Sequence, residues 1–161
     1  MNRTTLCYLF DGQKVLLLHR VKKEHDENAG MYVGLGGHFE AGESPEDCML
    51  REVYEESGVV PDRFSYRGVV LFHSDIWPDE EMHLFTATAT ISSLPDCDEG
   101  ELRLVERRDL FSLPMWEGDR IFLRLLLDGA PFFHLELFYA GPHLDRAILD
   151  GRPLNAGLSG G

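Results

Sequence analysis

The segment 44–58 constrains the fold most, because it carries both the start and the stop signals of an α-helix. Ser44 offers an N-cap, Pro45 suits the first helical position, and the two acids that follow complement the helix dipole. Gly58 supplies the left-handed residue with which many helices end. The sequence therefore predicts a helix over residues 44–57, about four turns long.

This predicted helix has two chemically different faces. At about 100° per residue, four apolar or aromatic side chains gather on the side that we expect to pack inward: Met49, Leu50, Val53 and Tyr54. Three acids gather on the opposite side: Glu52, Glu55 and Glu56. Taken alone, acids at this spacing are more often a solvated helix face than a site.

Neighbouring residues favour a metal site over a solvated face. Arg51 precedes the acids and can orient one of them through a charge-assisted hydrogen bond. Ahead of the helix, bare backbone is exposed by Gly34, Gly36 and Gly37. A carbonyl of this loop can join the carboxylates around a cation. Hard oxygen ligands without a cysteine or a histidine pair favour Mg²⁺ or Mn²⁺ over Zn²⁺, and such an ion accepts phosphate oxygens.

The overall composition narrows the class of protein and its partners. With 161 residues and 43% hydrophobic content, the chain suits one packed domain. The formal net charge of -13 disfavours long nucleic acid as a partner, because a polyanion would be repelled. Cys7, Cys48 and Cys97 lie far apart, and no stretch approaches the roughly 20 apolar residues that span a bilayer. We therefore expect a cytoplasmic protein that is not inserted in a membrane.

The remainder of the chain predicts strands and one further helix. Apolar runs rich in β-branched and aromatic residues predict strands over 4–10, 15–20, 31–37, 65–73, 83–91, 102–105 and 132–139. Asp11 and Gly12 predict a hairpin turn between the first two strands. Helical spacing of apolar residues predicts a helix over 118–127, and the polar segment 22–30 predicts a loop. This order favours an α+β fold with a mixed sheet and helices packed on it.

The helix and its preceding loop resemble a known family motif. Gly37, five residues, Glu43, seven residues, and then Arg-Glu-Val-Tyr-Glu-Glu-Ser-Gly-Val over 51–59 match the box of the Nudix hydrolase family at every fixed position. Gly36 and Glu40 extend the match. The resemblance implies the Nudix fold, a mixed β-sheet sandwiched between α-helices. We expect this domain to span residues 1–150, and the sequence of 151–161 predicts a flexible tail. The resemblance also implies hydrolysis of a phosphoanhydride bond in a nucleotide.

Matching to the motif assigns roles to particular residues. The implied metal ligands are the Gly36 carbonyl and the side chains of Glu52, Glu55 and Glu56. The implied catalytic residues are Glu55, Glu56, Arg51 and Glu99. Within this set, Glu55 would bind a second ion or help to activate water, and Arg51 would fix Glu52. Glu43 would support the junction between loop and helix, and Glu99 resembles a ligand or base outside the box.

Outside the box, the chain is similar to the MutT-like branch in the segments 96–100, 116–119 and 130–133. That branch implies conversion of a nucleoside triphosphate, such as 8-oxo-dGTP, to the monophosphate and pyrophosphate. The implied substrate contacts are Arg20, Gly37, Trp116 and Asp119. Trp116 would stack on a purine, and the Asp119 carboxyl group would hydrogen-bond its polar edge.

Several alternatives stay open at the level of sequence. Trp116 equally suits a core position, Asp119 equally suits a helix cap, and Arg20 and Glu99 equally suit the surface. The substrate could instead be ADP-ribose or another nucleoside diphosphate derivative. A protein of another class, a Nudix module that binds a nucleotide without cleaving it, usually lacks box acids that this chain retains.

Overall fold

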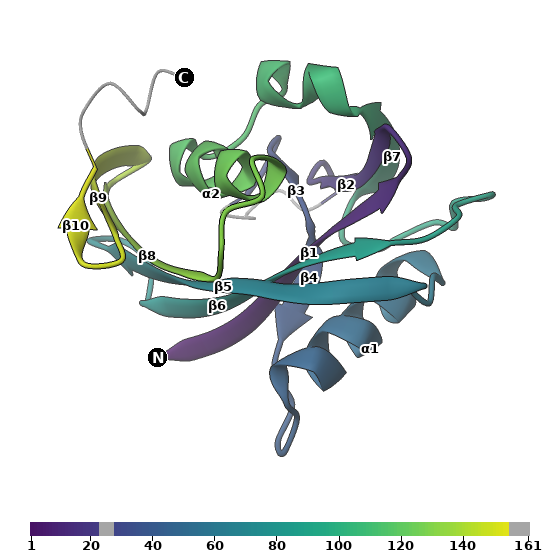
Figure 1. The fold of residues 1–161 in the computed structure, drawn as a ribbon, viewed down its shortest axis with the longest axis horizontal. Helices are drawn as coiled ribbons and strands as arrows, with labels where there is room; N and C mark the ends of the chain where they lie inside the picture. Colours follow the sequence, from purple (N-terminus) through teal and green to yellow (C-terminus); the bar gives the residue numbers. More distant parts are fainter. Residues whose placement is uncertain (23–27, 155–161) are drawn as a thin grey trace.

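The computed structural model describes residues 1–22 and 28–154. In this part of the chain, the strands form one mixed sheet with helices on both of its faces (Figure 1). Helix α1 (Pro45–Ser57) covers one face, whereas the 3₁₀-helix η1 (Arg107–Ser112) and helix α2 (Glu117–Leu127) cover the other. The predicted mixed sheet between helices is confirmed.

The strands, in chain order, are β1 (Asn2–Asp11), β2 (Lys14–His19), β3 (Tyr32–Val33), β4 (Leu35–His38), β5 (Arg63–Ser74), β6 (Glu80–Thr88), β7 (Glu101–Glu106), β8 (Phe133–Ala140), β9 (His143–Leu149) and β10 (Arg152–Pro153). Their order in the sheet is β10-β9-β8-β5-β6-β1-β2-β3, with β4 paired to β1 and β7 paired to β2. The pairs β1–β6 and β5–β8 are parallel, and the others are antiparallel.

Most of the predicted strands are confirmed, with changes at three places. The hairpin of β1 and β2 turns at Gly12, which has a φ of 59°. The run 31–37 divides into β3 and β4, because the chain changes partner there from β2 to β1. Neither β9 nor η1 was predicted from the sequence.

The prediction of a flexible tail is wrong for Arg152 and Pro153, since a turn at Asp150 and Gly151 pairs them with β9. Residues 155–161, and 23–27 of the predicted loop, lie outside the described residues.

Helix α1 has the predicted ends but a different buried face. Ser44 caps its N-terminus in a capping box with Asp47, and Gly58 closes it with a φ of 73°. The expectation that Tyr54 packs inward is wrong, because 59% of this residue is exposed. Glu56 is buried instead, at 6% exposure. The helix packs on β4 and β1. Glu56 lies on the same side of the helix as Met49, so both side chains face the sheet.

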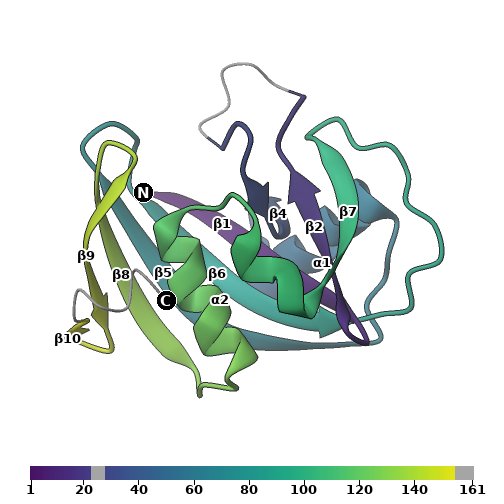
Figure 2. The ribbon, with the colours of Figure 1, turned by 90° about the horizontal axis from the view of Figure 1, so that it is seen from above.

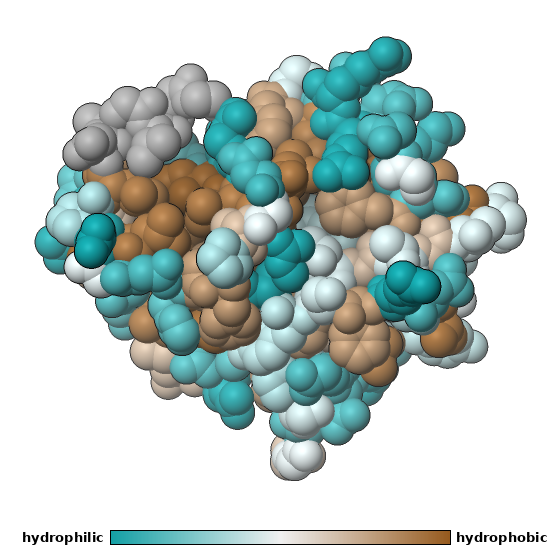
Figure 3. Space-filling view, in the orientation of Figure 1, coloured by the Kyte–Doolittle hydropathy of each residue, from teal (hydrophilic) through white to brown (hydrophobic). Residues whose placement is uncertain are grey.

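Two apolar clusters lie on the two faces of the sheet. Residues of β1 alternate between them, with Tyr8 packing beside α2 and Cys7 and Leu9 packing beside α1. Burial on both faces explains why β1 and β2 are nearly continuous apolar runs. The α2 cluster is the larger one, and α2 lies across β5, β6 and β8 when the molecule is seen from above (Figure 2). On the face drawn in Figure 3, the largest apolar area lies on the side formed by α2, β8 and β9.

The start of α2 is held closely against β8. The Gly118 N–H donates to the Tyr139 hydroxyl at 2.7 Å. A Cβ atom on Gly118 would lie 2.5 Å from Leu137 Cδ1 and 2.6 Å from that hydroxyl. Glycine is therefore required for the helix to approach the strand, and this approach orients the first turn of α2.

Among the described residues, no helix combines the length and the apolar character that a membrane span needs.

Candidate active site

One cavity of about 680 Å³ joins the box to the start of α2. At one end, which we call the acidic end, it is lined by Arg20, Gly36, Gly37, Arg51, Glu52, Glu56 and Glu99. At the other, which we call the aromatic end, it is lined by Phe72, Trp77, Glu80, Trp116, Asp119 and Tyr139. The fold thus brings most of the predicted site residues around one space.

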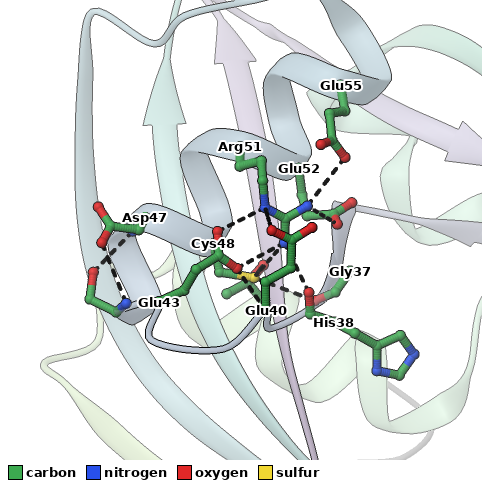
Figure 4. A network of polar contacts seen from close by, with 11 residues as sticks. Gly37, His38, Glu40, Glu43, Asp47, Cys48, Arg51, Glu52 and Glu55 are labelled. Atoms are coloured by element: carbon green, nitrogen blue, oxygen red, sulfur yellow. Dashed lines mark hydrogen bonds and ion pairs between the residues drawn. The ribbon is translucent and has the colours of Figure 1, made fainter.

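Arg51 organises the acidic end through its guanidinium group (Figure 4). Nε and Nη2 donate to the two carboxylate oxygens of Glu43 at 2.7 and 2.9 Å. Nη1 donates to Glu52 Oε1 at 2.7 Å, and Nη2 also donates to the His38 carbonyl at 3.0 Å. The Arg51 hydrogen bonds, with one from the Glu40 N–H, lower the pKa of Glu43 to about 2. The predicted fixing of Glu52 by Arg51 and the predicted support of the loop–helix junction by Glu43 are both present in this geometry.

Glu52 lies directly over the backbone of the glycine loop. A Cβ atom on Gly37 would come within 2.5 Å of the Glu52 carboxylate. On Gly36, a Cβ atom would lie 1.8 Å from the Thr5 carbonyl oxygen in the neighbouring strand. Both glycines are therefore needed for α1, β4 and β1 to come this close.

Glu56 is the buried carboxyl group of the acidic end. Its Oε1 accepts a hydrogen bond from the Gly36 N–H at 2.9 Å. Burial raises the pKa of Glu56 to about 8, aided by the negative charges of Glu52 and Glu99 and opposed by the Gly36 N–H and by Arg20. A group with such a pKa exchanges protons near neutral pH, as acid–base catalysis requires.

Glu55 is the one predicted site acid that the fold turns away from this space. Its side chain is 54% exposed, pairs with Arg51 at 3.2 Å, and is not part of the cavity lining. The reason lies in the helix geometry, since Glu55 precedes the buried Glu56 by one residue, about 100° around α1, and falls on the solvent side. Its metal and catalytic roles stay predictions.

Arg20 and Glu99 meet at the edge of the acidic end. Arg20 Nη2 lies 3.5 Å from Glu99 Oε2, and both residues line the cavity. The Arg20 side chain is 19% exposed, so the interpretation as an ordinary surface arginine is wrong. The pair places one cation beside the acids, where a phosphate group of a ligand would lie.

The acidic end suits a hard divalent cation. No group of three or more His, Cys, Asp or Glu side chains within 1–22 and 28–154 is already drawn together as a metal site. Mg²⁺, however, retains waters and usually binds one or two carboxylates together with substrate phosphates. Glu52 and Glu56 supply two carboxylates beside the backbone of Gly36, and their mutual repulsion, which contributes to the raised pKa of Glu56, would be relieved by a cation.

At the aromatic end, Trp116 forms a wall of the cavity. Its Nε1 donates to Asn28 Oδ1 at 2.8 Å, and its ring meets Tyr139 edge to face at 5.5 Å. Trp116 is partly exposed and belongs to the cavity lining, so the interpretation as a core residue is wrong. One face of an indole held in this way can accept a flat ring.

Asp119 projects from α2 into the aromatic end. It is 5% exposed, and the helix begins at Trp116 without a side-chain cap, so the interpretation of Asp119 as a cap is wrong. Burial raises the pKa of Asp119 to about 8, aided by the charge of Glu80 and opposed by Arg120. At neutral pH the group is therefore a neutral carboxyl that can donate a hydrogen bond.

Sequence reasoning missed several residues of the aromatic end: Asn28, Phe72, Trp77, Glu80 and Tyr139. They come from different strands and loops and share no spacing along the chain. The only signal was alternation in the strands, which places Phe72 and Tyr139 on one face of the sheet but does not identify a cavity.

Comparisons with known proteins agree with this geometry. The NUDIX domain family profile matches residues 1–126. The Nudix hydrolase YvcI of Bacillus subtilis is 31% identical over 139 residues, which cover 83% of this chain and 84% of YvcI. The NAD-capped RNA hydrolase NudC of Vibrio parahaemolyticus is 38% identical over 73 residues, which cover 45% of this chain and 24% of NudC.

A solved structure extends the similarity over nearly the whole chain. The mutator protein MutT from Bacillus halodurans superposes with a TM-score of 0.83 at 26% identity, covering 95% of this chain and 100% of that protein. The match includes the elements after the box, among them those that form the aromatic end.

Proposed function

Because the chain belongs to the Nudix hydrolase family, whose enzymes cleave phosphoanhydride bonds in nucleotide derivatives, we propose that it hydrolyses a nucleoside triphosphate to the monophosphate and pyrophosphate. An oxidised purine such as 8-oxo-dGTP is the proposed substrate. The observation that carries this proposal is the single cavity, which joins the box carboxylates to Trp116 and Asp119. A phosphate chain would lie at the acidic end and the base at the aromatic end.

Divalent metal ions are general in this family, and the proposed ion is Mg²⁺, with Mn²⁺ as a substitute. Glu52, Glu56 and the Gly36 carbonyl would hold it. When bound, the ion would neutralise phosphate charge and make the water that attacks phosphorus more acidic. The network of Arg51 supports this role, because its hydrogen bond orients the Glu52 carboxylate before any ligand arrives.

The protein's own side chains would carry the remaining steps. Arg20 would contact a phosphate oxygen, and the nearby Glu99 carboxylate would accept a proton from the attacking water. Glu56, with a pKa of about 8, would hold or release a proton according to the charge near it. The water would attack phosphorus in line, and the nucleoside monophosphate or the pyrophosphate on the opposite side of that phosphorus would depart as the leaving group.

A dinucleotide or ADP-ribose is the second candidate substrate. The partial similarity to NudC and a cavity of about 680 Å³ both favour it. A module that binds without cleaving is less well supported, since Arg51, Glu52 and Glu56 are all present and form an ordered network. We place the reaction in the cytoplasm with a small nucleotide and no long nucleic acid, in keeping with the net charge of -13.

Product analysis across a substrate panel tests this proposal. We expect Mg²⁺-dependent release of pyrophosphate from 8-oxo-dGTP, with a kcat/KM at least about tenfold above those for dGTP, dATP, ADP-ribose and diadenosine polyphosphates. A higher kcat/KM for ADP-ribose or a dinucleotide would reject the triphosphate assignment. Release of orthophosphate in place of pyrophosphate would reject the proposed bond, and absence of any hydrolysis would favour the binding module.

A further inference from the structure

A second carboxyl group reaches the aromatic end from a strand far from α2 in the sequence. Glu80 is the first residue of β6 and lines the same cavity as Asp119. Its Oε2 accepts a hydrogen bond at 2.9 Å from the hydroxyl of Thr4, a residue that is 6% exposed. The carboxylate of Glu80 is thus anchored to β1 by one oxygen and open to the cavity.

Glu80 and Asp119 interact electrostatically. After burial, the negative charge of Glu80 is the largest cause of the raised pKa of Asp119. Near neutral pH, Asp119 is therefore a neutral carboxyl group, whereas the Glu80 carboxylate already accepts a hydrogen bond from Thr4. An ionised carboxylate only accepts hydrogen bonds, whereas a neutral carboxyl group also donates one.

We propose that Glu80 is a specificity-determining residue that acts with Asp119 to select a guanine-type base at the aromatic end. The inference rests on the proposed function, because it names the base of that substrate. A guanine-type ring presents a carbonyl oxygen together with N–H donors, which match one donating and one accepting carboxyl group. Trp116 supplies the flat wall against which the ring would lie, and the anchored Glu80 needs no rearrangement to accept the N–H groups.

Base selection can be measured without turnover, by calorimetric binding of dGMP and dAMP. Glu80→Gln keeps an acceptor oxygen for Thr4 but replaces the carboxyl group with an amide. We expect this change to weaken dGMP binding about 10- to 100-fold, as for loss of a charged hydrogen bond, and dAMP binding by less than about threefold. Glu81→Gln is the matched control, since Glu81 is the next residue of β6, faces away from this cavity and pairs with Arg3. It should change both affinities by less than about threefold.

The pH dependence of binding gives a second readout. We expect the dGMP preference to fall as the pH rises from 7 to 9, because Asp119 loses its proton and with it the donor. In Asp119→Asn the amide keeps an N–H donor, so the preference should not change over this range. Thermal unfolding of each variant checks that the fold is intact.

Several outcomes would overturn the inference. These are a wild-type protein without preference for dGMP, equal losses of dGMP and dAMP affinity in Glu80→Gln, or equal effects of Glu80→Gln and Glu81→Gln. The proposed function can fail while this inference on the base site stands. A guanine preference that depends on Glu80, in a protein that hydrolyses no triphosphate, would reject the proposed reaction and support the assignment of the base site.

Discussion

Two carboxyl groups near the two ends of the cavity lie in opposite environments. Beside the acidic end, and outside the cavity lining, Glu43 is bound by the guanidinium group of Arg51, and its pKa is lowered to about 2. At the aromatic end, Asp119 is buried next to the charge of Glu80, and its pKa is raised to about 8. The same functional group is therefore a fixed anion in one place and a neutral hydrogen-bond donor in the other.

This difference follows from what surrounds each carboxyl group. Arg51 contacts Glu43 ahead of α1 and Glu52 and Glu55 within α1, which keeps negative charge stable before a ligand binds. Asp119 is buried, and the larger of the charge effects on its pKa comes from another acid, Glu80, opposed by Arg120. One end is prepared for cations and phosphate, and the other for a flat polar ring.

Replacement of Glu56 should produce the largest effect, because Glu56 is the buried acid of the acidic end. Glu56→Gln is expected to lower kcat at least about 10³-fold while the folded structure is retained. Glu55→Gln is the comparison variant, and we expect a loss below about tenfold, since the Glu55 side chain is 54% exposed outside the cavity. Steady-state kinetics at saturating Mg²⁺ would measure both. Equal losses in the two variants would contradict the separation of their roles.

Arg51→Lys should keep the positive charge but remove hydrogen bonds that fix the carboxylates around Arg51. A lysine cannot hold Glu43 through two donors and Glu52 through a third, so we expect a loss of about 2–4 kcal/mol in the free energy of unfolding. Arg103→Lys is the matched control, because its bond to Glu101 is at the surface, and it should cost less than about 1 kcal/mol. Urea titrations would measure the free energy of unfolding of both variants. A loss in Arg51→Lys as small as that in Arg103→Lys would show that the network adds no stability.

Asp119→Asn tests the neutral state of Asp119 through the pH dependence of the free energy of unfolding. The folded-state pKa of about 8 lies above the ordinary value of 3.8, so protonated Asp119 stabilises the fold at low pH, and this contribution is lost as pH rises through about 8. Between pH 6 and 9, the wild-type free energy of unfolding should fall by on the order of 1–3 kcal/mol more than that of the variant. Parallel curves from urea titrations without added metal would contradict the neutral state of Asp119.

Local signals in the sequence located helix α1 and the contacts of Arg51 within it. Helix α1 has the predicted cap at Ser44 and the predicted end at Gly58, and the spacing within it places Arg51 beside the acids. Helical geometry relates residues three and four apart, so contacts within one helix follow from sequence alone. The apolar runs likewise predicted most strands, because alternating or continuous burial leaves its period in the chain.

The rotation of α1 and the whole aromatic end depended on tertiary packing. Hydrophobicity alone would bury Tyr54 and expose Glu56. The structure shows the reverse, because a backbone N–H of β4 donates to Glu56 while Tyr54 lies in solvent. Glu80 and Asp119 line one cavity only because the fold brings the start of β6 and the first turn of α2 to the same place. The sequence by itself determined the family motif, the ends of α1 and the charges available. Only the tertiary structure decided which acids are paired and which are buried, since desolvation and long-range charge depend on neighbours that no local spacing reveals.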